Sequence, residues 1–132
     1  MPNPYSSSAG SAYRESEVLT ASPGRLVVLT YDGLLAALTR ARVGVVMKNY
    51  EVQLAGFDKS RALVGELFAA LDHDRGGDIA RQLGALYLFI LGELTTLGIK
   101  PDVKQIDRII AIVRELRDAF DQIAHTPRRE VA

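Results

Sequence analysis

Few residues in this chain could do chemistry, and the densest set lies in the short acidic stretch 72–78. Three aspartates there surround Gly76-Gly77, which is the composition of a calcium-binding loop. In such a loop Gly76 would supply the fifth ligand, and the twelfth position, which needs a bidentate glutamate, is Leu83. The stretch is therefore not predicted to bind calcium, and neither a metal nor an organic cofactor is expected.

Histidine and cysteine chemistry is equally sparse. The chain has no cysteine, which excludes disulfides, thiolate nucleophiles and zinc sites built on cysteine. Its two histidines, His73 and His125, show neither a Ser-His-Asp arrangement nor the two-histidine spacing of a zinc protease helix. Glycine motifs that cradle phosphates are also missing from the sequence. These absences predict a protein that is not an enzyme.

The composition is that of one globular domain without a dominant charge. The 132 residues are 48% hydrophobic and 24% charged, which is enough apolar content for a single core. Sixteen basic and sixteen acidic residues cancel, so neither nucleic acid nor an anionic membrane surface is an expected partner. The longest apolar runs, such as Leu86 to Leu91, fall far short of the roughly 20 residues of a spanning helix, so no membrane insertion is expected.

Residues 1–21 differ in composition from the rest of the chain. They are rich in serine, proline and glycine, and they lack the basic start and apolar centre of a secretory signal. This pattern predicts a flexible N-terminal segment on a cytoplasmic protein. Tyr5, Tyr13, Val18 and Leu19 are isolated apolar anchors suited to covering a groove, although an uninvolved disordered leader fits the same composition.

Helix signals begin at Ser22. Ser22 can cap a helix that starts at Pro23 and is predicted to run to Lys48, with Asn49 as its C-terminal break. A second helix is predicted from Glu51 to Leu71. The apolar stripes step by three and four residues, as bundle helices require: Val27, Tyr31, Leu34, Leu38, Ala41 and Val45 in the first helix, and Phe57, Ser60, Val64, Leu67 and Leu71 in the second.

Turn-forming residues separate the remaining two helices. The glycines of stretch 72–78 predict a tight reversal, after which Asp78 caps a third helix that ends at Gly98 and Pro101. Asp102 is predicted to cap a fourth helix, which Thr126-Pro127 ends. The stripes are Ile79, Leu83, Leu86, Ile90, Leu94 and Leu97 in the third helix, and Ile106, Ile109, Val113, Leu116, Phe120 and Ile123 in the fourth.

These four helices, joined by short loops, predict an all-α fold. Helices of about 20 residues with such loops form an antiparallel up-down-up-down four-helix bundle. The predicted organisation is a flexible segment over residues 1–21 that covers a groove, a bundle over residues 22–125 and a disordered tail over residues 126–132.

The helices carry more apolar residues than a bundle core needs, which is about three positions in seven. The surplus residues are Val28 and Val46 in the first helix, Tyr87, Leu88, Phe89 and Leu91 in the third, and Ile110 and Ile112 in the fourth. A contiguous exposed apolar patch usually marks a binding site, for example for a partner's amphipathic helix. The same surplus could close a homodimer or lie under the N-terminal segment, and these alternatives stay open.

The order of several short motifs resembles the family of the flagellar secretion chaperone FliS. The similarity begins at Ala12-Tyr13 and spans nearly the whole chain. The other matching stretches are Ala21-Ser22-Pro23-Gly24-Arg25-Leu26, Tyr31-Asp32-Gly33, Ala41-Arg42, Leu71-Asp72, Gly76-Gly77-Asp78-Ile79-Ala80, Leu83, Leu86-Tyr87 and Leu116-Arg117-Asp118-Ala119-Phe120.

The resemblance implies a definite activity. Members of this family are antiparallel four-helix bundles that bind the C-terminal segment of flagellin in the cytoplasm, prevent its polymerisation and present it to the cytoplasmic domain of the flagellar type III export gate. The family's N-terminal tyrosine, which is similar to Tyr13, is expected to cover the vacant groove. A homodimeric adaptor bundle without chaperone activity is the rival interpretation.

The chain departs from the family pattern at a few positions. Leu88 stands where aspartate is usual, Leu97-Gly98 replaces a common Ala-Asn, Phe120 replaces a frequent tryptophan, and Thr30 replaces a large apolar residue. Leu88 and Leu97 would enlarge the apolar face. Together with the surplus apolar positions, the resemblance gives the predicted flagellin-binding residues: Tyr13, Leu83, Tyr87, Leu88, Leu91, Ile110 and Ile112.

Overall fold

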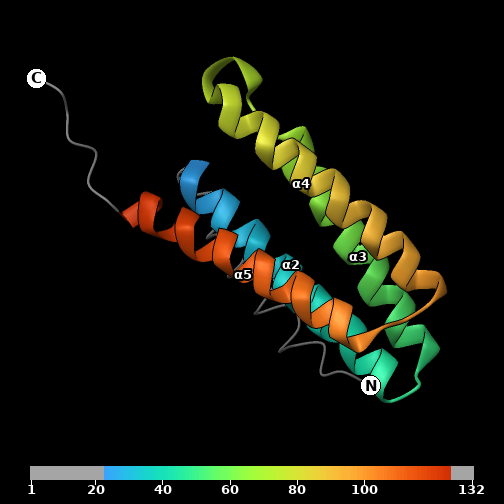
Figure 1. Cartoon of the computed structure of the whole chain (residues 1–132). Coiled ribbons are helices and arrows are strands. Elements are labelled where there is room, and N and C mark those ends of the chain that lie inside the picture. Colours follow the sequence, from blue (N-terminus) through green and yellow to red (C-terminus); the bar gives the residue numbers. More distant parts are fainter. Residues whose placement is uncertain (1–22, 126–132) are drawn as a thin grey trace, which may run out of the picture.

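The computed structural model describes residues 23–125 as four helices joined by short loops (Figure 1). The helices are α2 (Pro23–Val46), α3 (Tyr50–Ala69), α4 (His73–Ile99) and α5 (Val103–His125). The predicted all-α four-helix bundle is confirmed, and residues 23–125 contain no strand. The N-terminal segment, the residue Ser22 and the tail 126–132, all part of the predicted organisation, lie outside the described residues.

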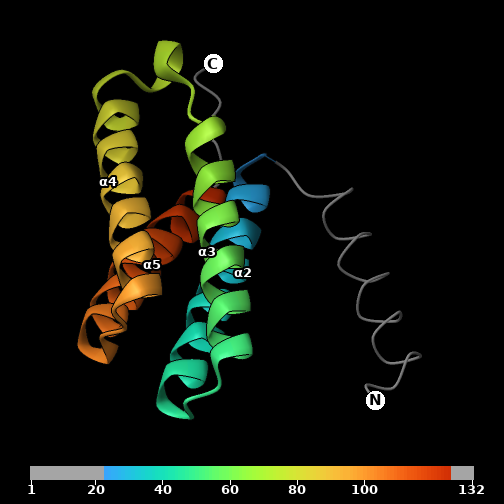
Figure 2. The same cartoon turned by 90° about the vertical axis from the view of Figure 1, so that its right-hand side faces the viewer.

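The helices do not pack equally against one another. Helix α2 packs against α3 and α5, and α3 packs against α4. Figure 1 accordingly shows two layers, α2 with α5 and α3 with α4. Within the described residues the backbones of α4 and α5 scarcely approach each other, and Figure 2 shows α5 running obliquely to α4. The α4–α5 side is therefore the most loosely packed of the four, while core residues of both helices, such as Ile90 and Ile109, are buried.

All four helices contribute to one apolar core. Its fully buried large side chains include Tyr31, Leu34 and Leu38 of α2, Phe57 and Val64 of α3, Ile90 and Leu94 of α4, and Ile106, Ile109 and Val113 of α5. All of these lie on the predicted stripes. Hydrophobic periodicity therefore identified the inward face of each helix correctly.

Four residues have an exposure that the periodicity predicts wrongly. Ile79 and Ile123, expected in the core, are 68% and 70% exposed because they lie near helix ends where the helices diverge. Val28 and Tyr87, expected as surplus, are 0% and 2% exposed because the contact between helices is wider than a single stripe. The pattern thus predicts which side of a helix faces the core more reliably than it predicts how much of that side a neighbouring helix buries.

The boundaries of α2 and α3 differ from the prediction around Asn49. Asn49 caps the start of α3, where its side chain accepts a hydrogen bond of 3.2 Å from the Val52 N–H, instead of merely ending α2. Lys48 makes the turn, with a φ of 53°. Helix α2 ends at Val46, earlier than predicted, and α3 ends at Ala69 instead of Leu71.

The start of α4 also differs. Asp72, rather than Asp78, accepts the capping hydrogen bond, from the Arg75 N–H at 3.1 Å, so a helical turn forms before the glycine pair. Gly77 then kinks the helix with φ 49° and ψ −122°, a conformation that glycine adopts readily. At the start of α5 the predicted cap is confirmed, since Asp102 accepts a hydrogen bond of 3.0 Å from the Lys104 N–H.

Helix α4 is unusually apolar. By length and composition alone it is the one described helix that could cross a membrane, with a mean hydropathy of 1.4 over its most apolar window. Core helices of soluble proteins pass the same test, and α4 packs its Tyr87, Ile90 and Leu94 into the bundle. Only 28% of that window is buried, however, so α4 presents a large apolar surface outward.

Candidate partner-binding pocket

An apolar pocket of about 340 Å³ opens at the end of the bundle where α4 begins and α5 ends. We call it the end pocket. Its lining residues are Val27, Leu67, Ala70, Leu71, Asp72, Arg75, Gly76, Ile79, Ala80, Leu83, Tyr87 and Phe120. They come from all four helices, and the pocket exists because α5 diverges from α4 at this end. An apolar concavity that is already formed is the usual character of a binding site.

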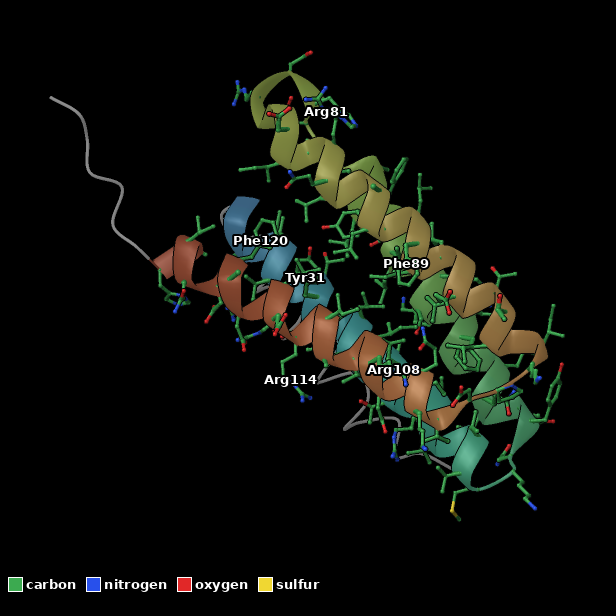
Figure 3. All side chains as sticks on the ribbon, viewed as in Figure 1. Tyr31, Arg81, Phe89, Arg108, Arg114 and Phe120 are labelled. Carbon is green, nitrogen blue, oxygen red and sulfur yellow. The ribbon has the colours of Figure 1, made fainter. Side chains whose placement is uncertain are left out.

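Two aromatic residues of the lining, Tyr87 and Phe120, contact Tyr31. The hydroxyl groups of Tyr31 and Tyr87 are hydrogen-bonded inside the core. The Tyr31 ring also stacks on Phe120 of α5, with ring centroids 5.5 Å apart, and Figure 3 labels both residues at the α2–α5 contact. Burial is the main cause that raises the pKa of both phenols, so the pair stays neutral. The pocket floor therefore offers apolar surface, and its buried hydroxyl is already bonded.

The rim of the end pocket is more polar. Asp72 and Arg75 lie on the short turn before Gly77, within 3.8 Å of each other. Ile79, the exposed residue that follows the kink, extends the apolar lining toward the surface. An apolar floor with a mixed-charge rim is suited to a side of an amphipathic helix, whose apolar residues enter while its polar residues stay in water.

Charged residues fasten α5 to α2 beside this pocket. The Arg117 Nε donates to Asp32 Oδ1 at 2.8 Å, and Arg25 lies 3.5 Å from Asp121. The hydrogen bond to Asp32 is the main cause that raises the pKa of the Arg117 guanidinium. At the opposite end of the same two helices, Arg42 donates two hydrogen bonds to Asp107, at 2.6 and 3.2 Å. This pairing lowers the pKa of the Asp107 carboxyl.

The outward side of α4 forms a second apolar surface. This outer face of α4 consists of Leu88, Phe89, Gly92, Thr95, Thr96 and Ile99, all exposed and within one side of the helix. Leu88, Phe89 and Ile99 are 57%, 50% and 85% exposed. Glu93 is the one charged residue between Gly84 and Ile99, and it accepts a hydrogen bond from Gln105 at 3.0 Å. The outer face of α4 is therefore uncharged as well as apolar.

The structure separates the predicted binding residues into three groups. Leu83 and Tyr87 line the end pocket, although Tyr87 is a core residue and not a surplus one. Leu88 lies on the outer face of α4. The half-buried residues Leu91, Ile110 and Ile112 pack against the core and do not line the end pocket. Tyr13 lies outside the described residues.

Several pocket-lining residues are absent from the predicted binding set because the sequence pattern assigns them to the core. Val27, Leu71 and Phe120 lie at or near the ends of their stripes, where they pack against the core and also line the pocket. The glycine pair and the position of these residues near helix ends are the signals that could have identified them. Periodicity alone does not say where two helices separate.

The described residues bring no three histidine, aspartate or glutamate side chains together as a metal site. Within the same range every buried side-chain nitrogen or oxygen has a hydrogen-bond partner. The Oγ of the fully buried Ser60, for instance, donates to the Gly56 carbonyl at 2.7 Å. The end pocket is thus the best-defined candidate site, and its chemistry is apolar.

Comparison with known proteins identifies the family of this bundle. A family model described as flagellar protein FliS matches residues 5–127, nearly the whole chain. The chain belongs to the FliS family. It is 30% identical to the flagellar secretion chaperone FliS of Vibrio cholerae over 109 residues, which cover 83% of this chain and 80% of the relative.

FliS proteins of other bacteria show similar identity to this chain. The flagellar secretion chaperone FliS of Salmonella typhimurium is 29% identical over 125 residues, 91% of this chain and 93% of the relative. That of Bacillus subtilis is 27% identical over 128 residues, 97% of this chain and 91% of the relative. The similarity therefore covers the bundle as a whole rather than a single motif.

Proposed function

We propose that this FliS family member is a flagellin export chaperone. In this proposal it binds the C-terminal segment of flagellin in the cytoplasm, prevents premature polymerisation and delivers the segment to the flagellar type III export gate. It acts by binding and not by catalysis, in keeping with relatives that are named secretion chaperones.

The end pocket is the observation that carries this proposal. It is about 340 Å³ in volume, almost wholly apolar, and open between helices that contact each other only slightly. A chaperone for a segment that is unfolded on its own must supply apolar surface on which the segment can order as an amphipathic helix. Leu83 and Phe120 would contact the apolar side of such a helix, and Asp72 and Arg75 would flank its polar side.

The outer face of α4 is a second apolar surface, on the side of the helix opposite the pocket residues Leu83 and Tyr87. Ordering a disordered segment costs free energy, which a large wrapped interface can offset. A cargo that enters the end pocket and also wraps around α4 would cover Leu88 and Phe89, which are otherwise half exposed. Leu91, Ile110 and Ile112 pack against the core, so in this proposal they support the bundle rather than contact the cargo.

The N-terminal segment is proposed to cover the vacant pocket, with Tyr13 as its anchor. The described chain begins at Pro23, one helical turn before Val27 of the pocket lining. Tyr13→Ala is expected to raise the association rate of a cargo peptide by about three-fold, because less of the pocket is covered before binding. Stopped-flow fluorescence measures this rate, and an unchanged rate would remove Tyr13 from the mechanism.

The proposed activity is tested by the polymerisation of flagellin itself. Light scattering of seeded flagellin should stay low when an equimolar amount of this protein is present. It should rise when this protein is left out. Flagellin truncated at its N-terminal segment is the matched cargo control, since it keeps the proposed binding segment and should still form a complex on a sizing column. Normal polymerisation in the presence of the folded protein would reject the proposal.

A homodimeric adaptor remains the second candidate because apolar residues are exposed at the other end of the bundle as well. Val43, Val46, Met47 and Tyr50, around the α2–α3 turn, are 49%, 54%, 71% and 65% exposed. Analytical ultracentrifugation distinguishes the two functions. A tight dimer that a flagellin peptide does not dissociate would favour the adaptor, and a monomer that forms an equimolar complex would favour the chaperone.

A further inference from the structure

Two motifs that the sequence places far apart meet beside the end pocket. Tyr31 and Asp32 are neighbours on α2, and Arg117 and Phe120 lie one turn apart on α5. Tyr31 stacks on Phe120 with centroids 5.5 Å apart, and Asp32 accepts a hydrogen bond of 2.8 Å from the Arg117 Nε. The two contacts form a joint between the helices, one apolar and one charged.

The C-terminal half of α5 depends on this joint for its position. Its buried residues Ile106, Ile109 and Val113 all lie in the first half of the helix, and residues 114–125 include none that is buried. Leu116 and Phe120 are only partly buried against the core. A helix segment with so little buried apolar surface is held weakly. Each of its remaining contacts therefore contributes strongly to its position.

Helix α4 offers little alternative support. Within the described residues α4 and α5 scarcely pack against each other, and the end pocket occupies the space between them. Phe120 is the pocket's lining residue from α5. The α5 wall of the pocket is therefore supported from the α2 side, where Arg25 and Asp121 form a second ion pair at 3.5 Å.

We infer that Asp32 and Arg117 are positioning residues, which hold Phe120 in place as the α5 wall of the end pocket. Neither lines the pocket, and both act through the helix that carries the ring. Their effect on cargo binding rests on the proposed function, whereas their effect on the position of Phe120 does not. The guanidinium side chain is 27% exposed and the carboxylate 40%, so a substitution there disturbs little of the core.

A tryptophan reporter tests this inference without any ligand. The chain has no tryptophan, so Phe120→Trp introduces a single indole into the pocket wall. Adding Asp32→Ala should shift its emission to the red and about double its acrylamide quenching constant, because the helix segment leaves its packed position more often. Asp32→Glu, which keeps the charge, should restore most of the parent emission.

Asp107→Ala is the matched control. It removes an ion pair between the same two helices, with Arg42, at the end remote from the pocket. The inference predicts that this variant leaves the emission of the introduced indole unchanged while circular dichroism shows equal helicity in all variants. Equal spectra for Asp32→Ala and Asp107→Ala would overturn it. If Phe120→Trp does not fold, ¹⁹F NMR of a fluorophenylalanine-labelled chain reports on Phe120 instead, assigned by Phe120→Leu and judged by the same criterion.

A flagellin C-terminal peptide separates this inference from the proposed function. If both hold, Asp32→Ala raises the peptide's dissociation rate by about three-fold, whereas Asp107→Ala leaves it unchanged. A changed indole signal with no peptide binding to any variant would support the positioning role and reject the cargo. Peptide binding that is identical in the two alanine variants, with unchanged indole spectra, would reject the positioning role and keep the cargo.

Discussion

Among the described residues, the hydroxyl groups of Tyr31 and Tyr87 form the one hydrogen bond between side chains of different helices that lies fully inside the apolar core. A buried hydroxyl without a partner is costly, so each tyrosine depends on the other. The pair joins α2 to α4 directly beneath the end pocket, because Tyr87 also belongs to the lining. Its contribution should therefore be measurable in stability as well as in the shape of the site.

Tyr87→Phe should destabilise the protein by about 1–3 kcal/mol, since the Tyr31 hydroxyl stays buried and loses its partner. The double variant Tyr31→Phe/Tyr87→Phe removes both hydroxyl groups and should recover much of this loss. Urea unfolding followed by circular dichroism measures the three free energies of unfolding. Additive losses in the double variant would show that the two hydroxyl groups do not depend on each other.

Alkaline pH should destabilise the fold through the same pair. Burial raises the pKa of both phenols in the folded chain, whereas unfolded tyrosine ionises near its ordinary value of about 10. Above that pH the unfolded chain loses protons that the folded chain keeps. Stability is therefore intact below about pH 10 and falls above it, by up to about 1.4 kcal/mol per pH unit for each phenol.

The measurement is the free energy of unfolding at several pH values between 8 and 11, a range that brackets the ordinary tyrosine pKa of about 10. Tyr31→Phe/Tyr87→Phe is the control, and its stability should fall less steeply because two of the responsible phenols are gone. Parallel profiles for the variant and the parent would contradict a role for the pair.

Single residues also show what the sequence can predict. The core residues at the middle of the stripes, such as Leu38 and Ile109, followed directly from their spacing. The exposure of Ile79 and the burial of Tyr87 did not, because both depend on how far a neighbouring helix extends along α4. Periodicity defines a direction around a helix axis, whereas burial also needs a partner on that side.

At the level of elements, α2 and α3 cross at very short range. A Cβ built on Gly56 would lie 2.4 Å from the Ala41 nitrogen, and one built on Gly44 would lie 2.3 Å from the Gln53 nitrogen. Both contacts are with backbone, which cannot move aside as a side chain can. The small residues at this crossing therefore permit the closest helix pair of the bundle.

Gly56→Ala should destabilise the protein by about 3 kcal/mol, because the added methyl group forces the two backbones apart. Gly65→Ala on the same helix is the matched control, since its Cβ meets nothing within 4 Å. That control should gain up to about 1 kcal/mol from helix propensity. Thermal unfolding of both variants measures the difference, and equal midpoints would show that the α2–α3 crossing is not tight.

The elements themselves were largely predictable, for reasons that differ along the chain. Asp102 precedes α5 and caps it as expected, because an aspartate side chain readily accepts hydrogen bonds from the free N–H groups of a helix start. Asn49 was interpreted as the end of a helix, although in a loop as short as 47–49 it caps the next one. The kink at Gly77 could be identified only from the structure, because the glycine pair is compatible with either a loop or a break within a helix.

On the scale of the whole molecule, α4 and α5 pack loosely against each other, and the end pocket lies between them. The sequence and its resemblance predicted the four helices and a surplus of apolar surface, but not the oblique path of α5 that creates the end pocket. Packing and the Asp32–Arg117 hydrogen bond join α5 to α2 through residues that are distant in the chain. The end pocket and the outer face of α4 are separate apolar surfaces, and their proposed roles can be compared directly.

Ile79→Glu and Leu88→Glu place a carboxylate on the end pocket and on the outer face of α4, respectively, at positions 68% and 57% exposed. If the pocket anchors the cargo, Ile79→Glu should lower the affinity for a flagellin peptide by about ten-fold or more, because binding would bury an unpaired charge. Leu88→Glu should weaken it less. Fluorescence anisotropy measures both affinities, and a larger loss for Leu88→Glu would place the main contact on the outer face of α4.

Calorimetric titration with a synthetic C-terminal flagellin segment tests the proposed function most directly. Apolar burial coupled to folding predicts saturable heat near equimolar stoichiometry and a negative heat-capacity change between two temperatures. A scrambled peptide of the same composition should give no saturable heat. The absence of binding heat at both temperatures, with the protein folded, would contradict the assignment of this bundle as a flagellin chaperone.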